Sequence, residues 1–252
     1  MSQKIRIAVD AMGGDNSPKK IIDGIIHNSK KNKDAVYNIF GDKILIESFL
    51  PDNYNNNIFF ITDTKNKILD TDSPLTAAKK GKDTSMWMTI QSLKNKDSDI
   101  AISAGNTGAL FVIAKLILKM LENIDKPALS ALWPNKKNFN VVLDLGANIE
   151  CNDKNLLDFS IMGSSLYKAL YPDEKAVVAL LNVGSEELKG NDTIKKAYNN
   201  LQNRKNNNFD FYGYIEGNNI MDGNVNVIVT DGFTGNIALK TAEGTANFIV
   251  NK

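Results

Sequence analysis

The chain has 252 residues, 42% hydrophobic and 23% charged, enough to bury a full core as one large α/β domain or as two closely packed lobes. Thirty basic against 29 acidic side chains give a formal charge of +1, so we expect no nucleic-acid partner. The single cysteine, Cys151, excludes an internal disulfide framework, and the single histidine, His27, excludes a Ser-His-Asp triad, a Cys-His pair and a His-based zinc site.

The first residues lead directly into a charged strand rather than into a secretion signal, so we expect a cytoplasmic location. The most apolar segment, residues 109–121, contains Lys115 and Lys119 on one stripe of a helix. This segment is too short and too charged to span a bilayer.

Apolar runs of strand length alternate with helical patterns along the chain. Strands are expected at residues 5–9, 36–40, 58–61, 100–102, 141–143, 176–181 and 225–229, and helices near 17–31, 84–96, 105–122, 153–171, 191–203 and from about 234 onward. This alternation predicts an α/β fold with a doubly wound, mostly parallel sheet. The last helical pattern continues to Lys252 without a closing turn, so we expect a chain truncated at its C-terminus.

Glycine-rich polar turns follow three of the expected strands, at residues 103–108, 144–148 and 231–236. The carboxyl ends of parallel strands form the crevice in which open α/β sheets bind ligands, and the N–H groups of a following helix point into it. Three such turns in one chain predict a single polar site of the size of a phosphate.

Two further segments, residues 10–18 and 181–190, are dense in unusual residues. The first lacks the G-x-G-x-x-G fingerprint of dinucleotide sites, and Ser17-Pro18 could equally be a helix N-cap followed by the first helical residue. In the second, Lys189 is suited to binding a phosphate or a developing oxyanion, although a solvated surface lysine is the commoner outcome. Glu216, in a turn at 213–220, could orient Lys189 or a phosphate, or could simply lie on the surface.

Several of these motifs, taken in order along the chain, closely resemble the PlsX family of bacterial acyl-acyl carrier protein:phosphate acyltransferases of phospholipid synthesis. The resemblance is carried by Val9–Asp15, Ser103–Leu110, Leu143–Asn148, Lys189-Gly190 and Asp231–Asn236, and extends to Thr84–Met86, Lys126–Leu129 and Phe159–Gly163. It covers essentially the whole chain and implies one domain of this type over residues 1–252.

The resemblance implies a three-layer α/β/α fold akin to phosphotransacetylases and isopropylmalate-type dehydrogenases. It implies transfer of a fatty acyl group from acyl carrier protein to inorganic phosphate, without a cofactor or a metal. It also implies a homodimer in peripheral contact with the inner membrane or with the glycerol-3-phosphate acyltransferase that acts next.

The residue chemistry and the resemblance together predict Lys189 and Asn236 as catalytic residues, Lys189 neutralising phosphate charge and Asn236 donating to the tetrahedral oxyanion. Gly105 to Gly108 and the amide of Asn148 are expected to hold phosphate, and apolar helices to receive the acyl tail. Asp144 and Asp231 are expected to cap helices or orient Lys189. The predicted binding residues are Ser103, Gly105, Asn106, Thr107, Gly108, Asp144, Asn148, Glu216, Asp231 and Gly235.

The chain departs from the family pattern at four positions, Glu150, Asp158, Ser185 and Tyr214, where Asp, an amide, an acidic residue and Asn are usual. Two alternative functions stay open. One is a phosphotransacetylase-like enzyme that uses coenzyme A thioesters, and the other is a non-catalytic dimer that binds acyl carrier protein or membrane. A nicotinamide dehydrogenase is disfavoured because the dinucleotide fingerprint is missing.

Overall fold

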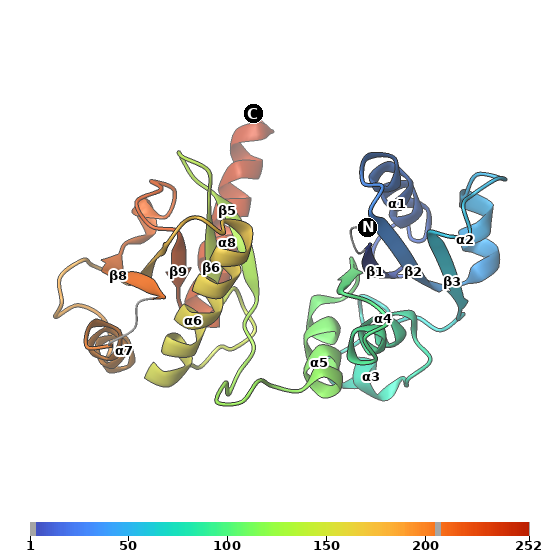
Figure 1. Cartoon of the computed structure of the whole chain (residues 1–252). Coiled ribbons are helices and arrows are strands. Elements are labelled where there is room, and N and C mark those ends of the chain that lie inside the picture. The colour runs from blue at the N-terminus through green and yellow to red at the C-terminus, as the bar shows by residue number, and fades with distance from the viewer. Residues whose placement is uncertain (1–3, 205–207, 252) are drawn as a thin grey trace. The chain divides into compact units, whose positions relative to one another are not determined.

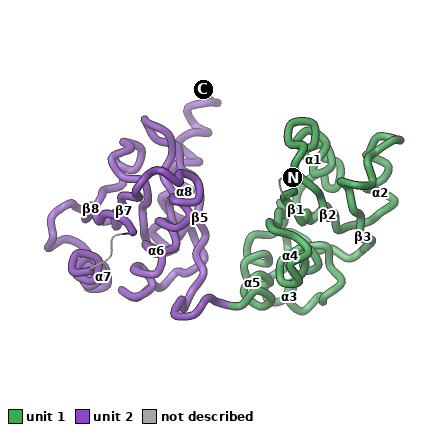
Figure 2. The backbone as a smooth tube through the Cα atoms, in the orientation of Figure 1, with its two compact units in different colours: residues 1–119 green, residues 120–252 purple. Residues whose placement is uncertain are grey.

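A computed structural model describes residues 4–204 and 208–251 and divides the chain into two compact units, residues 1–119 and 120–252 (Figure 2). Both units are α/β, which confirms the predicted fold class. The predicted strands are shared between two sheets, one in each unit (Figure 1). No helix in the described ranges is both long and apolar enough to cross a membrane.

The first unit is built on a sheet of four parallel strands in the order β3-β2-β1-β4. Its elements are β1 (Ile5–Asp10), α1 (Lys19–Lys31), β2 (Ala35–Gly41), α2 (Lys43–Phe49), β3 (Phe59–Asp63), α3 (Pro74–Lys79), α4 (Ser85–Lys94), β4 (Ile100–Ser103) and α5 (Thr107–Leu118). The chain moves outward from β1 through β2 to β3 and then returns to place β4 on the other side of β1. The topological switch point at which such sheets bind ligands therefore lies between β1 and β4.

Helices cover both faces of this sheet. On one face α1 and α2 bury a cluster that includes Ile22, Ile25, Tyr37 and Ile46. On the other face α4 packs against β1, β2 and β4, α5 packs in turn against α4, and α3 packs against α5. The result is a three-layer arrangement in which the loops at the carboxyl ends of β1 and β4 stay accessible.

The second unit has a sheet of five strands in the order β5-β6-β9-β7-β8, in which only β5 is antiparallel to its neighbour. Its elements are β5 (Ser130–Pro134), β6 (Phe139–Leu143), α6 (Asp153–Leu170), β7 (Ala176–Leu181), α7 (Asp192–Gln202), β8 (Phe209–Ile215), a short 3-10 helix (Gly217–Asn219), β9 (Val227–Val229) and α8 (Gly232–Val250). Alternate residues of β6 face opposite layers: Val141 packs towards α6 and α7, and Val142 towards α8.

All seven predicted strands and all six predicted helices are present, with ends shifted by a few residues. Two strands, two short α-helices and the 3-10 helix were not predicted. β5 is an edge strand that ends in Pro134, and β8 runs through Gly213 to Ile215, where the sequence had indicated only a turn. The helices α2 and α3 have 7 and 6 residues, too few to give a clear helical period.

The helix-cap interpretation of Ser17-Pro18 is wrong. Helix α1 begins at Lys19, and Pro18 occupies the cap position without a side-chain hydrogen bond. The hydroxyl of Ser17 instead donates to the carbonyl of Met12 at 2.9 Å, which closes the loop that follows β1.

Close packing of α6 onto the sheet depends on Gly163. A Cβ atom at this position would lie 2.5 Å from Val227 Cγ1 and 2.8 Å from Leu143 Cδ2, whereas a Cβ at Gly244 of α8 would meet nothing within 4 Å. We expect Gly163→Val to lower the free energy of unfolding by about 1–3 kcal/mol more than Gly244→Val, because only the first overpacks a core. Urea unfolding of both variants measures the difference, and equal losses would contradict this packing.

Candidate active site

In the first unit, the carboxyl ends of β1 and β4 are joined by a buried carboxylate. Asp10, the last residue of β1, is 1% exposed and accepts a hydrogen bond from Ser103 Oγ at 2.7 Å. Ser103, the last residue of β4, in turn accepts from the backbone N–H of Gly105 at 3.2 Å. The predicted binding residue Ser103 therefore fixes the start of the glycine-rich turn, at the switch point of the sheet.

The turn from Gly105 to Gly108 presents backbone N–H groups at the start of α5. Asn106 caps this helix by accepting from the N–H of Ala109 at 2.9 Å, and its own amide donates to the carbonyls of Asp70 and Asp72. Within the described ranges, the N–H groups of residues 106–108 have no acceptor. Because the positive end of the helix dipole lies at the same place, the turn can bind an anion through its backbone while the Asn106 side chain holds the turn in shape.

In the second unit, the carboxylate of Asp144 organises the loop that follows β6. Asp144 is fully buried and accepts five hydrogen bonds: from the N–H groups of Leu129, Gly146, Ala147 and Asn148 and from the Asn148 side chain, at 2.7–3.3 Å. Both amide hydrogens of Asn148 are thereby used, since Nδ2 also donates to the carbonyl of Pro127 at 2.7 Å. The predicted phosphate contact through this amide would require the Asn148 side chain to give up one of these bonds.

The start of α8 packs directly against this loop. Asp231 caps the helix by accepting from Thr234 N and Thr234 Oγ1, which confirms its predicted capping role. A Cβ at Gly235 would lie 2.0 Å from the carbonyl oxygen of Asp144, so only glycine permits this approach. The Asn236 amide, exposed at the helix surface, reaches the carbonyl of Leu145 at 3.3 Å.

Lys189 lies on the loop that follows β7, the strand beside β9 in the sheet. Its side chain is exposed and passes over Gly184, where a Cβ would lie 3.0 Å from Lys189 Cγ. Over the described ranges, the ammonium of Lys189 forms no ion pair with Asp144, Asp231 or any other acid. Lys189 is therefore an uncompensated cation at the carboxyl edge of the second sheet.

Glu216 follows β8 and precedes the short 3-10 helix, with its side chain half-buried. It makes no ion pair with Lys189 in the part of the chain that the structure describes. The predicted residues thus fall into two clusters: Ser103 to Gly108 in the first unit, and Asp144, Asn148, Lys189, Glu216, Asp231, Gly235 and Asn236 around the carboxyl ends of parallel strands in the second.

Among the residues that the structure describes, neither His27 nor Cys151 has a partner for nucleophilic catalysis. His27 is exposed on α1. Burial raises the pKa of the Cys151 thiol, and the Sγ atom donates to the carbonyl of Asn148, so Cys151 stays a protonated thiol at neutral pH. The described residues contain no group of three or more His, Cys, Asp or Glu side chains that could hold a metal ion.

Two residues of these clusters were not predicted as functional. Asp10 belongs to the motif Val9–Asp15, but spacing along the chain does not predict that it is buried and accepts a hydrogen bond from Ser103. Asn182, at the end of β7, is 8% exposed, and its amide donates to the carbonyls of Gly184 and Lys189 at 3.1 and 3.2 Å. Asn182 therefore fixes both ends of the loop that carries Lys189.

The prediction that Lys189 is catalytic implies that Asn182→Ala, by loosening this loop and displacing Lys189, lowers kcat by roughly tenfold with a small change in KM. Asn182→Asp keeps the size of the side chain but places a carboxylate oxygen against the two carbonyl oxygens, which repel it. We therefore expect Asn182→Asp to lower kcat at least as much as Asn182→Ala does. Steady-state kinetics, with circular dichroism to confirm folding, measure the effect. An unchanged kcat in Asn182→Ala would remove Asn182 from this role.

Comparison with solved structures defines the class of fold to which these clusters belong. The chain is similar to the EutD phosphotransacetylase from Staphylococcus aureus, with a TM-score of 0.67 and 15% identity over 97% of this chain and 83% of that one. It is also similar to a phosphotransacetylase from Streptococcus pyogenes, with a TM-score of 0.69 and 13% identity over 98% and 83%. At these identities the likeness establishes the phosphotransacetylase-like α/β/α fold that the sequence had predicted.

Sequence comparison identifies the family. Residues 5–251 match the family described as "Fatty acid synthesis protein". The chain is 68% identical over 252 residues to the phosphate acyltransferase of Pelagibacter ubique, covering 100% of this chain and 75% of that protein. It is 44% identical to the phosphate acyltransferase of Maricaulis maris, covering 96% and 70%. The chain belongs to this family of phosphate acyltransferases, as the motifs had indicated.

Proposed function

We propose that the chain is a phosphate acyltransferase that transfers a fatty acyl group from acyl carrier protein to inorganic phosphate and so supplies acyl phosphate for phospholipid synthesis. The observation that carries this proposal is the 68% identity to a phosphate acyltransferase over the full length of the chain. The unpaired N–H groups at residues 106–108 support it, because they form a site for a small anion.

The reaction needs charge stabilisation more than acid–base chemistry. A phosphate oxygen attacks the thioester carbonyl carbon, a C–O bond forms, and the C–S bond then breaks to release the carrier as a thiolate. Phosphate is already a nucleophile at neutral pH and a thiolate leaves readily, so no histidine is needed. The protein must hold phosphate and stabilise the oxyanion of the tetrahedral intermediate.

In this proposal the turn from Gly105 to Gly108 binds phosphate through backbone N–H groups. In the second unit Lys189 supplies a cation that stabilises negative charge in the reaction, and within the described ranges it forms no ion pair that would compensate this charge. Asn236 donates to the oxyanion, and its exposure on α8 leaves it accessible. Asp144, Asp231 and Gly235 shape the loop against which Asn236 lies, and Glu216 lines the same edge of the second sheet.

A second candidate, a phosphotransacetylase-like enzyme that uses coenzyme A thioesters, is favoured only by the shared fold. The two functions separate in one assay: the protein is incubated with phosphate and either a hexadecanoyl thioester of acyl carrier protein or hexadecanoyl coenzyme A. Acyl phosphate from the carrier thioester at a much higher kcat/KM supports the proposal. Preference for coenzyme A, or no product from either donor, would refute it.

We further propose that the protein acts as a homodimer in the cytoplasm, in peripheral contact with the membrane or with the glycerol-3-phosphate acyltransferase that uses its product. Large apolar side chains at loop tips of the second unit support contact with an apolar partner: Ile149, Val183 and Leu188 are 68%, 81% and 87% exposed. Sedimentation and vesicle co-flotation test the dimer and the membrane contact separately.

We expect Lys189→Met and Asn236→Ala each to lower kcat by about 10²-fold, the scale of losing one oxyanion donor. Lys137→Met, in the loop that joins β5 to β6, and Asn247→Ala, on the exposed surface of α8, are the matched controls. Acyl phosphate formation by purified protein is the measurement. Site variants that stay within threefold of their controls would show that these side chains are not catalytic.

We expect Gly105→Val to raise the KM for phosphate more than the KM for the acyl donor. A Cβ at Gly105 would lie 3.2 Å from Gly13 Cα and 3.0 Å from Met86 Cε, so a branched side chain must push the turn out of shape. Gly217→Val serves as the control, since a Cβ there meets nothing within 4 Å. Equal weakening towards both substrates would indicate general misfolding rather than loss of a phosphate site.

A further inference from the structure

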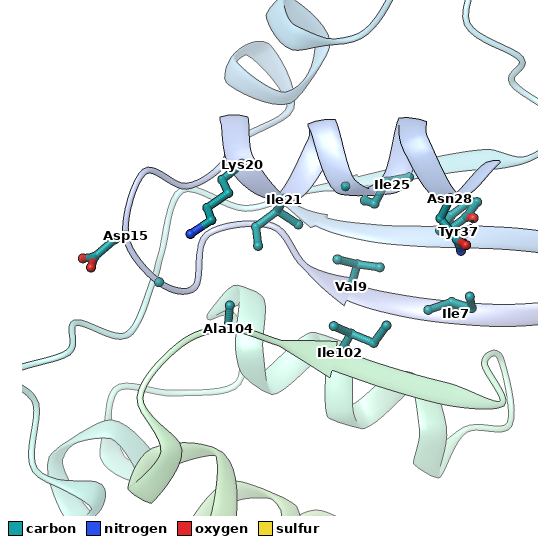
Figure 3. A pocket seen from close by; sticks show the side chains of 12 residues that line it. Ile7, Val9, Asp15, Lys20, Ile21, Ile25, Asn28, Tyr37, Ile102 and Ala104 are labelled. Atoms are coloured by element: carbon teal, nitrogen blue, oxygen red, sulfur yellow. Dashed lines mark hydrogen bonds between the residues drawn. The ribbon is translucent and has the colours of Figure 1, made fainter. Parts of the chain in front are cut away.

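The first unit contains an apolar groove that the proposed mechanism does not use. Its volume is about 610 Å3, within the range of roughly 300–1,000 Å3 typical of small-molecule sites. Figure 3 shows it between helix α1 and the strands β1 and β4, with Ile21 and Ile25 on the helix side and Ile7, Val9 and Ile102 on the sheet side.

The groove exists because α1 covers only part of its face of the sheet. Residues paired in register on neighbouring parallel strands share a face, and Val9 pairs with Ile102 as Ile7 pairs with Ile100. Val9 is 3% exposed in the cluster beneath α1, whereas Ile100 and Ile102 on β4 are 48% and 49% exposed. An apolar strip therefore continues from the core out along the edge strand.

The two ends of the groove differ in chemistry. At one end lie Gly14, Asp15, Lys20 and Ala104, and at the other Asn28 donates to the hydroxyl of Tyr37 at 2.8 Å (Figure 3). We call the end at Asn28 and Tyr37 the inner end and the end at Gly14 and Ala104 the open end. Asn28 and Tyr37 are hydrogen-bonded to each other, so the inner end does not require a polar ligand. Between the two ends the lining is almost entirely aliphatic.

The open end adjoins the phosphate-binding turn. Gly14 packs so closely on residue 104 that a Cβ would lie 2.6 Å from the Ala104 carbonyl oxygen, and a Cβ at Gly13 would lie 2.8 Å from the N–H nitrogen of Gly105. The loop after β1 and the turn after β4 therefore form one surface. A ligand in the groove has its outer end beside residues 104 and 105, with Lys20 as a cation at the same end.

We propose that this groove binds the hydrocarbon tail of the fatty acyl donor, with the thioester end at Gly14 and Ala104 and the tail running inward along β1 towards Tyr37. The proposal rests on the proposed function, which supplies the acyl chain. A lining that offers apolar contacts along its length and polar groups at its open end fits a long alkyl chain with a polar head. Each methylene group buried there raises affinity about fourfold.

Gly24 on α1 gives a direct way to fill the groove. It lines the cavity, and a Cβ added to it meets nothing within 4 Å, so larger residues fit the helix without a clash and raise its helical propensity. The series Gly24→Ala, Gly24→Leu and Gly24→Phe fills the groove in steps. Gly244→Phe, on α8 of the second unit, is the matched control because a Cβ there also meets nothing.

The first measurement is kcat/KM with hexadecanoyl and hexanoyl thioesters of acyl carrier protein. We expect the ratio of hexadecanoyl to hexanoyl activity to fall stepwise along the Gly24 series, by at least tenfold in Gly24→Phe, and to stay constant in Gly244→Phe. An unchanged ratio in a folded Gly24→Phe protein would overturn the groove assignment while leaving the proposed function intact.

The second measurement does not depend on turnover. We expect the fluorescent fatty acid cis-parinaric acid to bind the unmodified protein and to bind Gly24→Phe at least tenfold more weakly than Gly244→Phe. If the unmodified protein makes no acyl phosphate, the proposed function fails and this comparison still decides the groove. Equal binding of the fatty acid by both variants would overturn the proposal. A Gly24→Phe substitution that changes only the sedimentation coefficient would also overturn it, because that result would assign the groove to a second copy of the chain.

Discussion

A buried carboxylate at the end of a parallel strand is the constraint on which both units depend. Asp144 is fully buried, and its carboxylate accepts hydrogen bonds from five N–H donors. A buried carboxylate without such partners would strongly destabilise the fold. Those five bonds fold residues 144–148 into one loop shape. The carbonyl of Asn148 then accepts from Gly232, so the start of α8 takes its position from the same carboxylate. Asp10 has the corresponding place in the first unit, where it fixes Ser103.

The glycines of both clusters follow from this constraint. Once a loop is fixed by a buried carboxylate, the next segment packs on it through backbone atoms, at distances where no side chain fits. Gly235 over Asp144 and Gly14 beside Ala104 are the clearest cases in the two clusters, since added Cβ atoms would lie 2.0 and 2.6 Å from backbone oxygen atoms. The glycines of the motifs that identify the family are therefore packing requirements. Close backbone packing in turn leaves N–H groups, rather than flexible side chains, facing the edge of the sheet.

The sequence predicted much of the fold because its buried parallel strands are short continuous apolar runs, as at residues 141–143 and 176–181. It missed β5 and β8 for physical reasons. β5 lies at an edge and ends in proline, and β8 contains Gly213 at φ +107°, opposite a register shift in β7, so both contain residues typical of turns. The sequence left open one large domain or two lobes, because residues 119–128, between the last helix of one unit and the first strand of the other, carry no linker-like composition that would mark a boundary.

Within the candidate site, the sequence located the glycine-rich turns at the strand ends but not how each side chain is used. Asparagines at 106 and 148 look alike in sequence as anion ligands, yet both use their amides to hold backbone carbonyls. Three of these four acceptors lie 21 to 36 residues away along the chain, so local spacing does not reveal them. What is left free in the described ranges is a set of backbone N–H groups at residues 106–108 and the ammonium of Lys189. Each of these groups is suited to stabilising negative charge without a proton relay, the N–H groups in the first unit and the ammonium in the second.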